Sequence, residues 1–241
     1  MADFQIFQAR QAALNDKVIS EWQGAKLDDK GLEKRVGTLD FQEPWFLELG
    51  YERSRSVCII PRLATGFLVS DDLLLTNNHV FPNERWADGV SVRFDYEQDR
   101  QGLAKAPSVF ALKPEIKFVT NVALDYTLIY VDGKPGKKFG YIDIARPGRA
   151  DLNMRANIIQ HPNLGFKKIA IRNNEIRFLS EEVIQYITDT EHGSSGSPVF
   201  DDQWDIIGLH YRHTSSENQG DLFYNEAKNI IAIAKSLSQH L

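Results

Sequence analysis

Hydrophobic and polar positions alternate in short runs from residue 56 onward. The runs are rich in β-branched and aromatic residues and are bounded by Gly, Pro, Asn, Asp or Ser, which is the pattern of β-strands joined by turns. A first group of runs predicts strands at 57–60, 66–69, 73–76, 90–94, 108–112 and 126–131. A second group predicts strands at 141–144, 156–160, 168–171, 175–179, 183–188, 198–200, 206–211 and 222–224.

A segment at 132–138 separates the two groups of predicted strands. It contains three lysines, two glycines and one proline in seven residues, a composition typical of an exposed connector. Many short strands in two groups predict two antiparallel barrels or sandwiches. Near the end of the chain, Ile230, Ile233 and Leu237 recur at helical spacing and predict a C-terminal helix over 227–237.

The first fifty residues follow a helical pattern instead. Phe4, Phe7, Leu14, Val18 and Trp22 are separated by three, seven and four residues, which places them on one face of an amphipathic helix. Two interpretations stay open. The helix either packs on its own domain, or it acts as a pro-segment that covers the cleft or as a helix that docks a regulatory or substrate-presenting protein. We therefore expect an N-terminal helical extension over 1–50, a first β-domain over 51–135, and a second β-domain with the C-terminal helix over 136–241.

Composition narrows the classes of function. The chain has 241 residues, 28 Lys plus Arg against 33 Asp plus Glu, and a net charge near −5, which argues against a nucleic-acid binder that relies on bulk charge. No apolar run approaches the roughly 20 residues of a membrane span, and we expect neither a secretory signal nor a membrane partner. The single cysteine, Cys58, rules out an intrachain disulfide. We expect a cytoplasmic protein without metal or other cofactor.

A serine flanked by glycines is the first candidate for chemistry. The segment 192–198 reads His-Gly-Ser-Ser-Gly-Ser-Pro. A hydroxyl nucleophile needs a tight turn with free backbone N–H groups beside it, and Gly193 has no side chain to block that approach. We therefore expect Ser195 to be a nucleophile, with the N–H groups of Gly193 and Ser195 forming an oxyanion hole.

A histidine and an aspartate complete the set. His79 follows a predicted strand, and a histidine in that place is a suitable general base. Asp125 comes directly before a strand that reads as fully buried, and a carboxylate there can orient an imidazole. Their order along the chain, His79, Asp125, Ser195, is the order found in catalytic triads of the chymotrypsin type.

These motifs resemble the trypsin-like peptidases of the chymotrypsin superfamily. Thr-Asn-Asn-His-Val at 76–80 and Gly-Ser-Ser-Gly-Ser-Pro-Val at 193–199 are similar to motifs of HtrA proteases and bacterial glutamyl endopeptidases. Flanking segments, among them Ile-Ile-Gln-His-Pro at 158–162, are more similar to cytoplasmic bacterial trypsin-like peptidases. The resemblance extends over about residues 32–232.

The resemblance implies an all-β fold of two six-stranded antiparallel barrels of chymotrypsin type. His79 and Asp125 are then on the first barrel, Ser195 is on the second, and the cleft lies between them. It also implies a serine endopeptidase that acts on protein or peptide substrates through an acyl-enzyme intermediate. One departure is Ser194, because secreted members of the family carry an aspartate there that pairs with a newly cut amino terminus.

The resemblance also bears on the side chain that precedes the scissile bond. Thr190 and His210 match the pocket residues that hydrogen-bond a carboxylate or amide in glutamyl endopeptidases, whereas Asp189 matches the position where trypsin selects Lys or Arg. Adjacent strand residues face opposite ways, so Asp189 and Thr190 should not both face the pocket. We favour Glu, Gln or Asp, with basic and small side chains as alternatives, and expect Tyr211 to contact substrate.

Two other functions compete with an active endopeptidase. One is a binding module that keeps the protease fold and has lost catalysis, although all three triad positions are present. The other is an esterase, although the strand-to-helix setting of the Gly-x-Ser-x-Gly motif of esterases is missing around Ser195.

Overall fold

The computed structural model describes residues 41–215 and 223–240. The chain divides into two compact units, Met1–Gln42 and Glu43–Leu241, and the second unit contains the elements that follow. The predicted amphipathic helix of the first fifty residues falls almost wholly outside the described residues, so its role stays a prediction.

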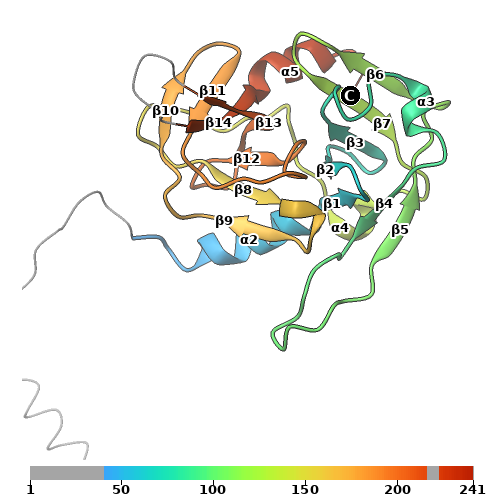
Figure 1. Cartoon of the computed structure of the whole chain (residues 1–241), viewed down its shortest axis with the longest axis horizontal. Helices are drawn as coiled ribbons and strands as arrows, with labels where there is room; N and C mark the ends of the chain where they lie inside the picture. Colours follow the sequence, from blue (N-terminus) through green and yellow to red (C-terminus); the bar gives the residue numbers. More distant parts are fainter. Residues whose placement is uncertain (1–40, 216–222, 241) are drawn as a thin grey trace, which may run out of the picture. The chain divides into compact units, whose positions relative to one another are not determined.

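The first sheet contains seven antiparallel strands in the order β5-β4-β1-β2-β3-β7-β6 (Figure 1). Its strands are β1 (Val57–Ile60), β2 (Ala64–Leu68), β3 (Leu73–Thr76), β4 (Ser91–Phe94), β5 (Ser108–Ala111), β6 (Phe118–Asn121) and β7 (Tyr126–Tyr130). Both faces of β1, β2 and β3 are buried, which explains their nearly continuous apolar sequences.

The second sheet also contains seven antiparallel strands, in the order β10-β11-β14-β13-β12-β8-β9 (Figure 1). Its strands are β8 (Asn157–Gln160), β9 (Lys168–Ala170), β10 (Ile176–Leu179), β11 (Val183–Tyr186), β12 (Pro198–Phe200), β13 (Ile206–Ser215) and β14 (Phe223–Asn229). The long β13–β14 pairing shifts register between His210 and Arg212, leaving Tyr211 as the extra residue of a β-bulge.

Within residues 41–215 and 223–240, five short helices connect or flank the strands. They are α2 (Trp45–Arg55), α3 (Glu84–Ala87), α4 (Gly136–Phe139), the 3₁₀ turn η1 (Pro162–Leu164) and α5 (Ile230–Leu237). The ring of Phe46 on α2 packs 5.0 Å from that of Trp204, so this helix is anchored on the loop between β12 and β13. Helix α5 starts where the Asn229 side chain accepts a hydrogen bond from the Ile231 N–H, a typical N-cap.

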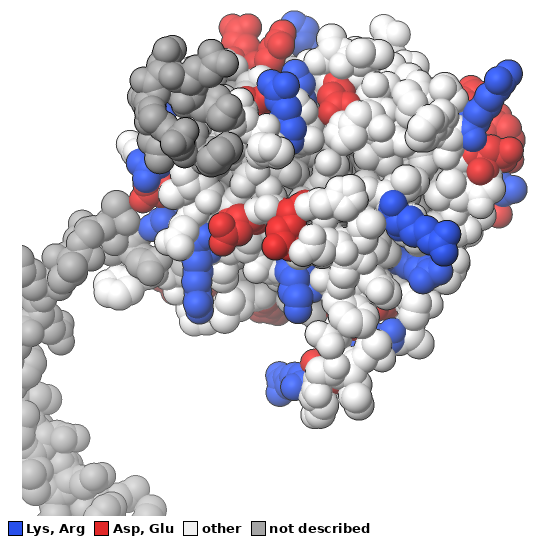
Figure 2. All heavy atoms as spheres, viewed as in Figure 1, with Lys and Arg blue, Asp and Glu red and all other residues white. Residues whose placement is uncertain are grey.

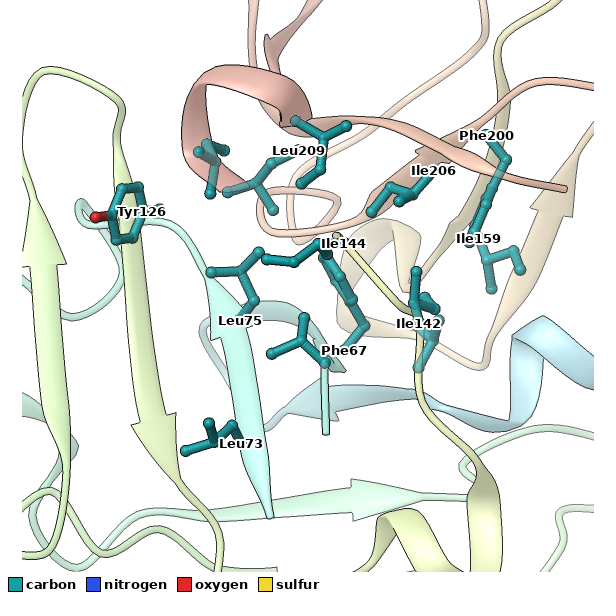
Figure 3. Close-up of a cluster of buried hydrophobic side chains, with 14 of the residues drawn as sticks. Phe67, Leu73, Leu75, Tyr126, Ile142, Ile144, Ile159, Phe200, Ile206 and Leu209 are labelled. Atoms are coloured by element: carbon teal, nitrogen blue, oxygen red, sulfur yellow. The ribbon is translucent and has the colours of Figure 1, made fainter. Parts of the chain in front are cut away.

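Three clusters of buried side chains form the core. One fills the first sheet and another fills the second. The third joins the two sheets, with Phe67 and Leu75 from the first meeting Ile206 and Leu209 from the second (Figure 3). Side chains from both sheets can therefore meet beside this shared cluster.

The predicted pair of antiparallel β-units is confirmed, with differences in detail. Each sheet has seven strands where the resemblance implied six. The strand at 118–121 was not predicted, and the predicted strand at 141–144 does not form. Ile142 and Ile144 are buried in the cluster between the sheets, so their alternation is real, but only the Ile142 N–H pairs, with the Leu68 carbonyl.

Candidate active site

His79 and Asp125 are held together by two hydrogen bonds. The His79 backbone N–H donates to Asp125 Oδ1 at 2.9 Å, and His79 Nδ1 lies 2.8 Å from Asp125 Oδ2. Asp125 lies in the turn between β6 and β7 with a positive φ of 44°, and the Asn77 side chain donates to its carbonyl at 3.0 Å. The turn and the two side-chain contacts fix the carboxylate against the imidazole.

This pairing determines which imidazole nitrogen can act as a base. A carboxylate only accepts hydrogen bonds, so Nδ1 carries the proton and Nε2 keeps its lone pair. The His79 side chain is 47% exposed and that of Asp125 only 14%. The carboxylate is thus shielded from water, while the imidazole faces the solvent from which a substrate arrives.

Ser195 lies in a loop, residues 191–197, that we call the serine loop. Gly193 and Gly196 flank Ser195 with φ values of 92° and 82°, a region that L side chains rarely adopt. A Cβ at Gly196 would lie 2.1 Å from the Thr65 carbonyl oxygen, and a Cβ at Gly193 would lie 2.8 Å from the carbonyl oxygen of His161. Both glycines are therefore required by backbone angle and by space.

The backbone N–H groups of Gly193 and Ser195 are free for a ligand. Within the described residues, neither group donates to a backbone carbonyl, although neighbouring N–H groups of the loop do. The Ser194 N–H donates to the Glu191 carbonyl at 3.0 Å, and the Glu191 N–H donates to Ser194 Oγ at 3.1 Å. This reciprocal pair closes the loop without the aspartate found at the Ser194 position in secreted members of the family.

The Ser195 hydroxyl points to a neighbour other than His79 in the described structure. Its Oγ lies 3.5 Å from the Tyr211 carbonyl, and no hydrogen bond joins it to His79. In structures without ligand, catalytic hydrogen bonds are often long and tighten only when substrate binds. The three predicted triad residues thus comprise one well-formed pair and a serine across from it on the second sheet.

His210 is buried beneath the serine loop. Its Nδ1 lies 2.7 Å from the hydroxyl of Tyr186, which is also buried. Burial, reinforced by the nearby His79 and His213, lowers the pKa of His210 to about 3, and burial raises the pKa of Tyr186 well above its usual value. The neutral imidazole is therefore the resting form of His210, contrary to a pocket that relies on a charged histidine.

The other predicted pocket residues lie beyond the end of β11, which stops at Tyr186. The Thr190 hydroxyl donates to the Asn225 side-chain oxygen at 2.5 Å, so its single proton is already engaged. Donation to a substrate, which the resemblance implies for this hydroxyl, stays a prediction and requires the contact with Asn225 to be exchanged. Asp189 is exposed, and the alternation of strand faces does not apply to it because the strand has ended. Sequence reasoning missed Asn225, which no motif marks.

A hollow of about 520 Å³ adjoins His79 and the paired strands β13 and β14. Arg212 and Lys228 flank the Tyr211 ring on its wall, with their cationic groups 5.0 and 5.1 Å from the ring centre. The hollow is lined by Asn78, His79, Val122, Ala123, Asp125, Tyr211, Arg212 and Lys228. A larger hollow of about 710 Å³, formed around β3 and the segment after α4, contains none of the predicted site residues.

Neither a patch of one charge sign on the face in Figure 2 nor a metal-binding cluster marks a second site within the described residues. On the face in Figure 2, acidic and basic side chains of the described residues are interspersed. No group of three or more His, Cys, Asp or Glu within the described residues is arranged to hold a metal ion. Among the helices described, none is long and apolar enough to cross a membrane.

Comparison with known proteins shows to which family the chain is similar. Residues 64–209 match the family described as "Trypsin-like peptidase domain". The uncharacterized protein y4fB of Sinorhizobium fredii is 36% identical over 213 residues, which are 78% of this chain and 32% of y4fB. The glutamyl endopeptidase of Staphylococcus aureus is 28% identical over 178 residues, which are 68% of this chain and 51% of that protein. The chain thus spans about a third to a half of these relatives.

Solved structures show the same fold. The active form of the Rv3671c protease of Mycobacterium tuberculosis superposes with a TM-score of 0.57 at 18% identity, covering 86% of this chain and 93% of that chain. A Glu endopeptidase superposes with a TM-score of 0.53 at 18% identity, covering 76% and 91% of the two chains.

Proposed function

Because the chain belongs to the trypsin-like peptidase family, we propose that it is a serine endopeptidase that uses Ser195, His79 and Asp125. The observation that carries the proposal is the pair of hydrogen bonds that the Asp125 carboxylate accepts from the backbone N–H and Nδ1 of His79. A carboxylate used only for a turn needs no imidazole at 2.8 Å, whereas a general base needs its tautomer fixed in this way.

The proposed reaction begins when His79 Nε2 takes the proton of the Ser195 hydroxyl. Ser195 Oγ then attacks the carbonyl carbon of the scissile peptide bond, and the resulting oxyanion is bound by the N–H groups of Gly193 and Ser195. His79 next gives its proton to the leaving amine, and an acyl-enzyme remains. Water activated by His79 hydrolyses this ester and restores Ser195.

The oxyanion hole is supported by the free N–H groups of the serine loop. Preorganised donors of this kind contribute much of the rate, because removing one costs about a hundredfold to a thousandfold in kcat. The left-handed conformation of Gly193 leaves its N–H unpaired in the described structure. Substrate oxygen is the acceptor that we propose for it.

For specificity we infer a preference for Glu, Gln or Asp before the scissile bond. The support is the neutral His210, oriented by the Tyr186 hydroxyl, together with the similarity to a Staphylococcus aureus glutamyl endopeptidase. When Tyr186 donates to Nδ1, the remaining imidazole proton is on Nε2. The Glu226 backbone also hydrogen-bonds the imidazole, so a substrate carboxylate or amide oxygen has to compete with it for this proton. Asp189 at the surface is a weaker candidate for selecting basic side chains, because water screens its charge.

Peptide-library cleavage tests activity and preference together. The wild-type protein should cut after acidic or amide residues and react with a fluorophosphonate probe, and the Ser195→Ala variant should do neither. Probe labelling that is unchanged in Ser195→Ala refutes the nucleophile. A folded wild-type protein that neither reacts with the probe nor cuts any peptide refutes the endopeptidase and favours a binding module with the protease fold.

A further inference from the structure

Thr65 connects the first sheet to the serine loop. It lies on β2, is completely buried, and within the described residues makes no hydrogen bond to a side chain of the proposed triad. Its backbone N–H donates to the Ser195 carbonyl at 2.9 Å. Its hydroxyl lies 2.8 Å from the Gly193 carbonyl oxygen and 3.1 Å from the backbone nitrogen of His161.

The direction of these hydrogen bonds follows from the atoms involved. The His161 N–H can only donate and the Gly193 carbonyl can only accept, so the single hydroxyl proton of Thr65 must point to Gly193. The hydroxyl therefore links two segments of the second sheet through one atom of the first. As long as the hydroxyl oxygen accepts from the His161 N–H, its own proton is fixed on the Gly193 carbonyl.

We propose that Thr65 is a positioning residue that holds Gly193 and Ser195 in place by their carbonyl groups, so that their N–H groups stay aimed at the oxyanion position. The inference rests on the proposed function of Gly193 and Ser195. Thr65 binds the carbonyl of both residues, and their N–H groups are the proposed donors to substrate. Fixing the Gly193 carbonyl constrains its ψ angle, so the flexible glycine keeps one backbone conformation, with a φ of 92°, instead of sampling others.

This placement predicts a kinetic effect with a specific form. Thr65 is completely buried and hydrogen-bonds none of the triad side chains, so we expect its loss to leave ground-state binding unchanged. The oxyanion forms only as the reaction proceeds, so misplaced N–H groups should lower kcat alone. A purely structural role would lower the amount of folded protein and leave the kcat of the folded fraction intact.

The test compares Thr65→Val, which keeps the shape and removes the hydroxyl, with Thr65→Ser, which keeps the hydroxyl. We expect Thr65→Val to lower kcat about tenfold to a hundredfold with KM unchanged within about twofold, and Thr65→Ser to stay near wild type. A peptide aldehyde, whose adduct oxygen occupies the oxyanion position, should bind Thr65→Val more weakly by a similar factor. Thr188→Val is the matched control, because Thr188 is also buried and donates to a backbone carbonyl at 2.8 Å, that of Ala156.

The outcomes separate this inference from the proposed function. Turnover by wild type but not by Ser195→Ala establishes the function first, and a folded Thr65→Val with wild-type kcat then refutes the inference alone. Should Thr65→Val be insoluble, Thr65→Ala is judged by the same kcat and aldehyde measurements. Should the wild type lack activity, crystal structures decide: a serine loop that is unchanged in Thr65→Val overturns the positioning role, and a turned Gly193 carbonyl supports it.

Discussion

Asp125→Asn is the sharpest test of the proposed triad. The amide oxygen of asparagine can replace Oδ1 and accept the His79 N–H, which donates at 2.9 Å in the wild type. The amide nitrogen then occupies the place of Oδ2, 2.8 Å from His79 Nδ1. An amide nitrogen only donates, so Nδ1 must become the acceptor and the imidazole proton moves to Nε2. The base then presents a proton, rather than a lone pair, to Ser195.

The expected loss is about 10³- to 10⁴-fold in kcat near pH 7, or about 4 to 5.5 kcal/mol at 1.36 kcal/mol per factor of ten. Stability should change by about 1 kcal/mol or less, because one hydrogen bond is kept and the other is reversed. Steady-state peptide hydrolysis gives kcat, and urea unfolding gives stability.

Asp143→Asn is the control for this experiment, because Asp143 is a carboxylate near the first sheet whose side chain is 50% exposed and caps the Ala145 N–H. We expect it to keep wild-type turnover. If Asp125→Asn is folded and retains more than about a tenth of wild-type kcat, Asp125 does not orient the base, and the functional meaning that we give to the His79 pair is wrong.

Buried groups give three further predictions. The folded-state pKa values of His161 and His210, about 4 and 3, lie below the ordinary value of 6.5, so their contribution to stability is complete above pH 6.5 and is lost as pH falls toward those values. In urea unfolding, each histidine should lower the free energy of unfolding by about 1.4 kcal/mol per pH unit in that range, and His161→Asn should remove the part due to His161. Gly196→Ala should yield little soluble protein or no probe labelling, because its Cβ would meet the Thr65 carbonyl; normal labelling contradicts the described loop. Tyr186→Phe should reduce the preference for Gln over norleucine before the scissile bond about tenfold in kcat/KM, and an unchanged ratio argues against His210 in the pocket.

Local sequence signals predicted much of the fold because the buried strands are short and self-contained. The predicted boundaries of 57–60, 73–76 and 198–200 agree with β1, β3 and β12, whose residues are buried on both faces. Phe118–Asn121 was missed because this edge strand is only partly buried and its sequence lacks a clear alternation. Strands that are buried on both faces could thus be predicted from their sequences, whereas the partly buried edge strand could not.

The failures have tertiary causes. The alternation at 141–144 is that of a strand, yet the segment finds no partner strand and buries its two isoleucines between the sheets instead. Residues 227–229 read as the first turn of the C-terminal helix, but they pair with β11 and β13, and the helix starts only after the Asn229 cap. Which strand lies alongside is information that no window of sequence contains.

The same distinction applies to the site. The positions of His79, Asp125 and Ser195 could be proposed from motifs, since each motif needs particular neighbours along the chain. The contacts of Thr65 and the engagement of Thr190 by Asn225 join residues more than thirty positions apart, and no local pattern marks them. The Thr65 contacts depend on how the two sheets are packed, which the third core cluster determines, and the Thr190 contact depends on the pairing of β14 with β11 within the second sheet.

The serine loop shows how the proposed enzyme can be ready to act without proteolytic activation. In a loop that depends on an aspartate and a new amino terminus, the oxyanion N–H groups are organised only after cleavage. Here Ser194 replaces that carboxylate and is satisfied by Glu191 within the loop, while Thr65 holds the loop from the other sheet. Both contacts are formed in the described structure. Because the serine loop offers no carboxylate for an amino terminus to neutralise, we expect any control of the proposed enzyme to act elsewhere, on access to the cleft or on delivery of substrate.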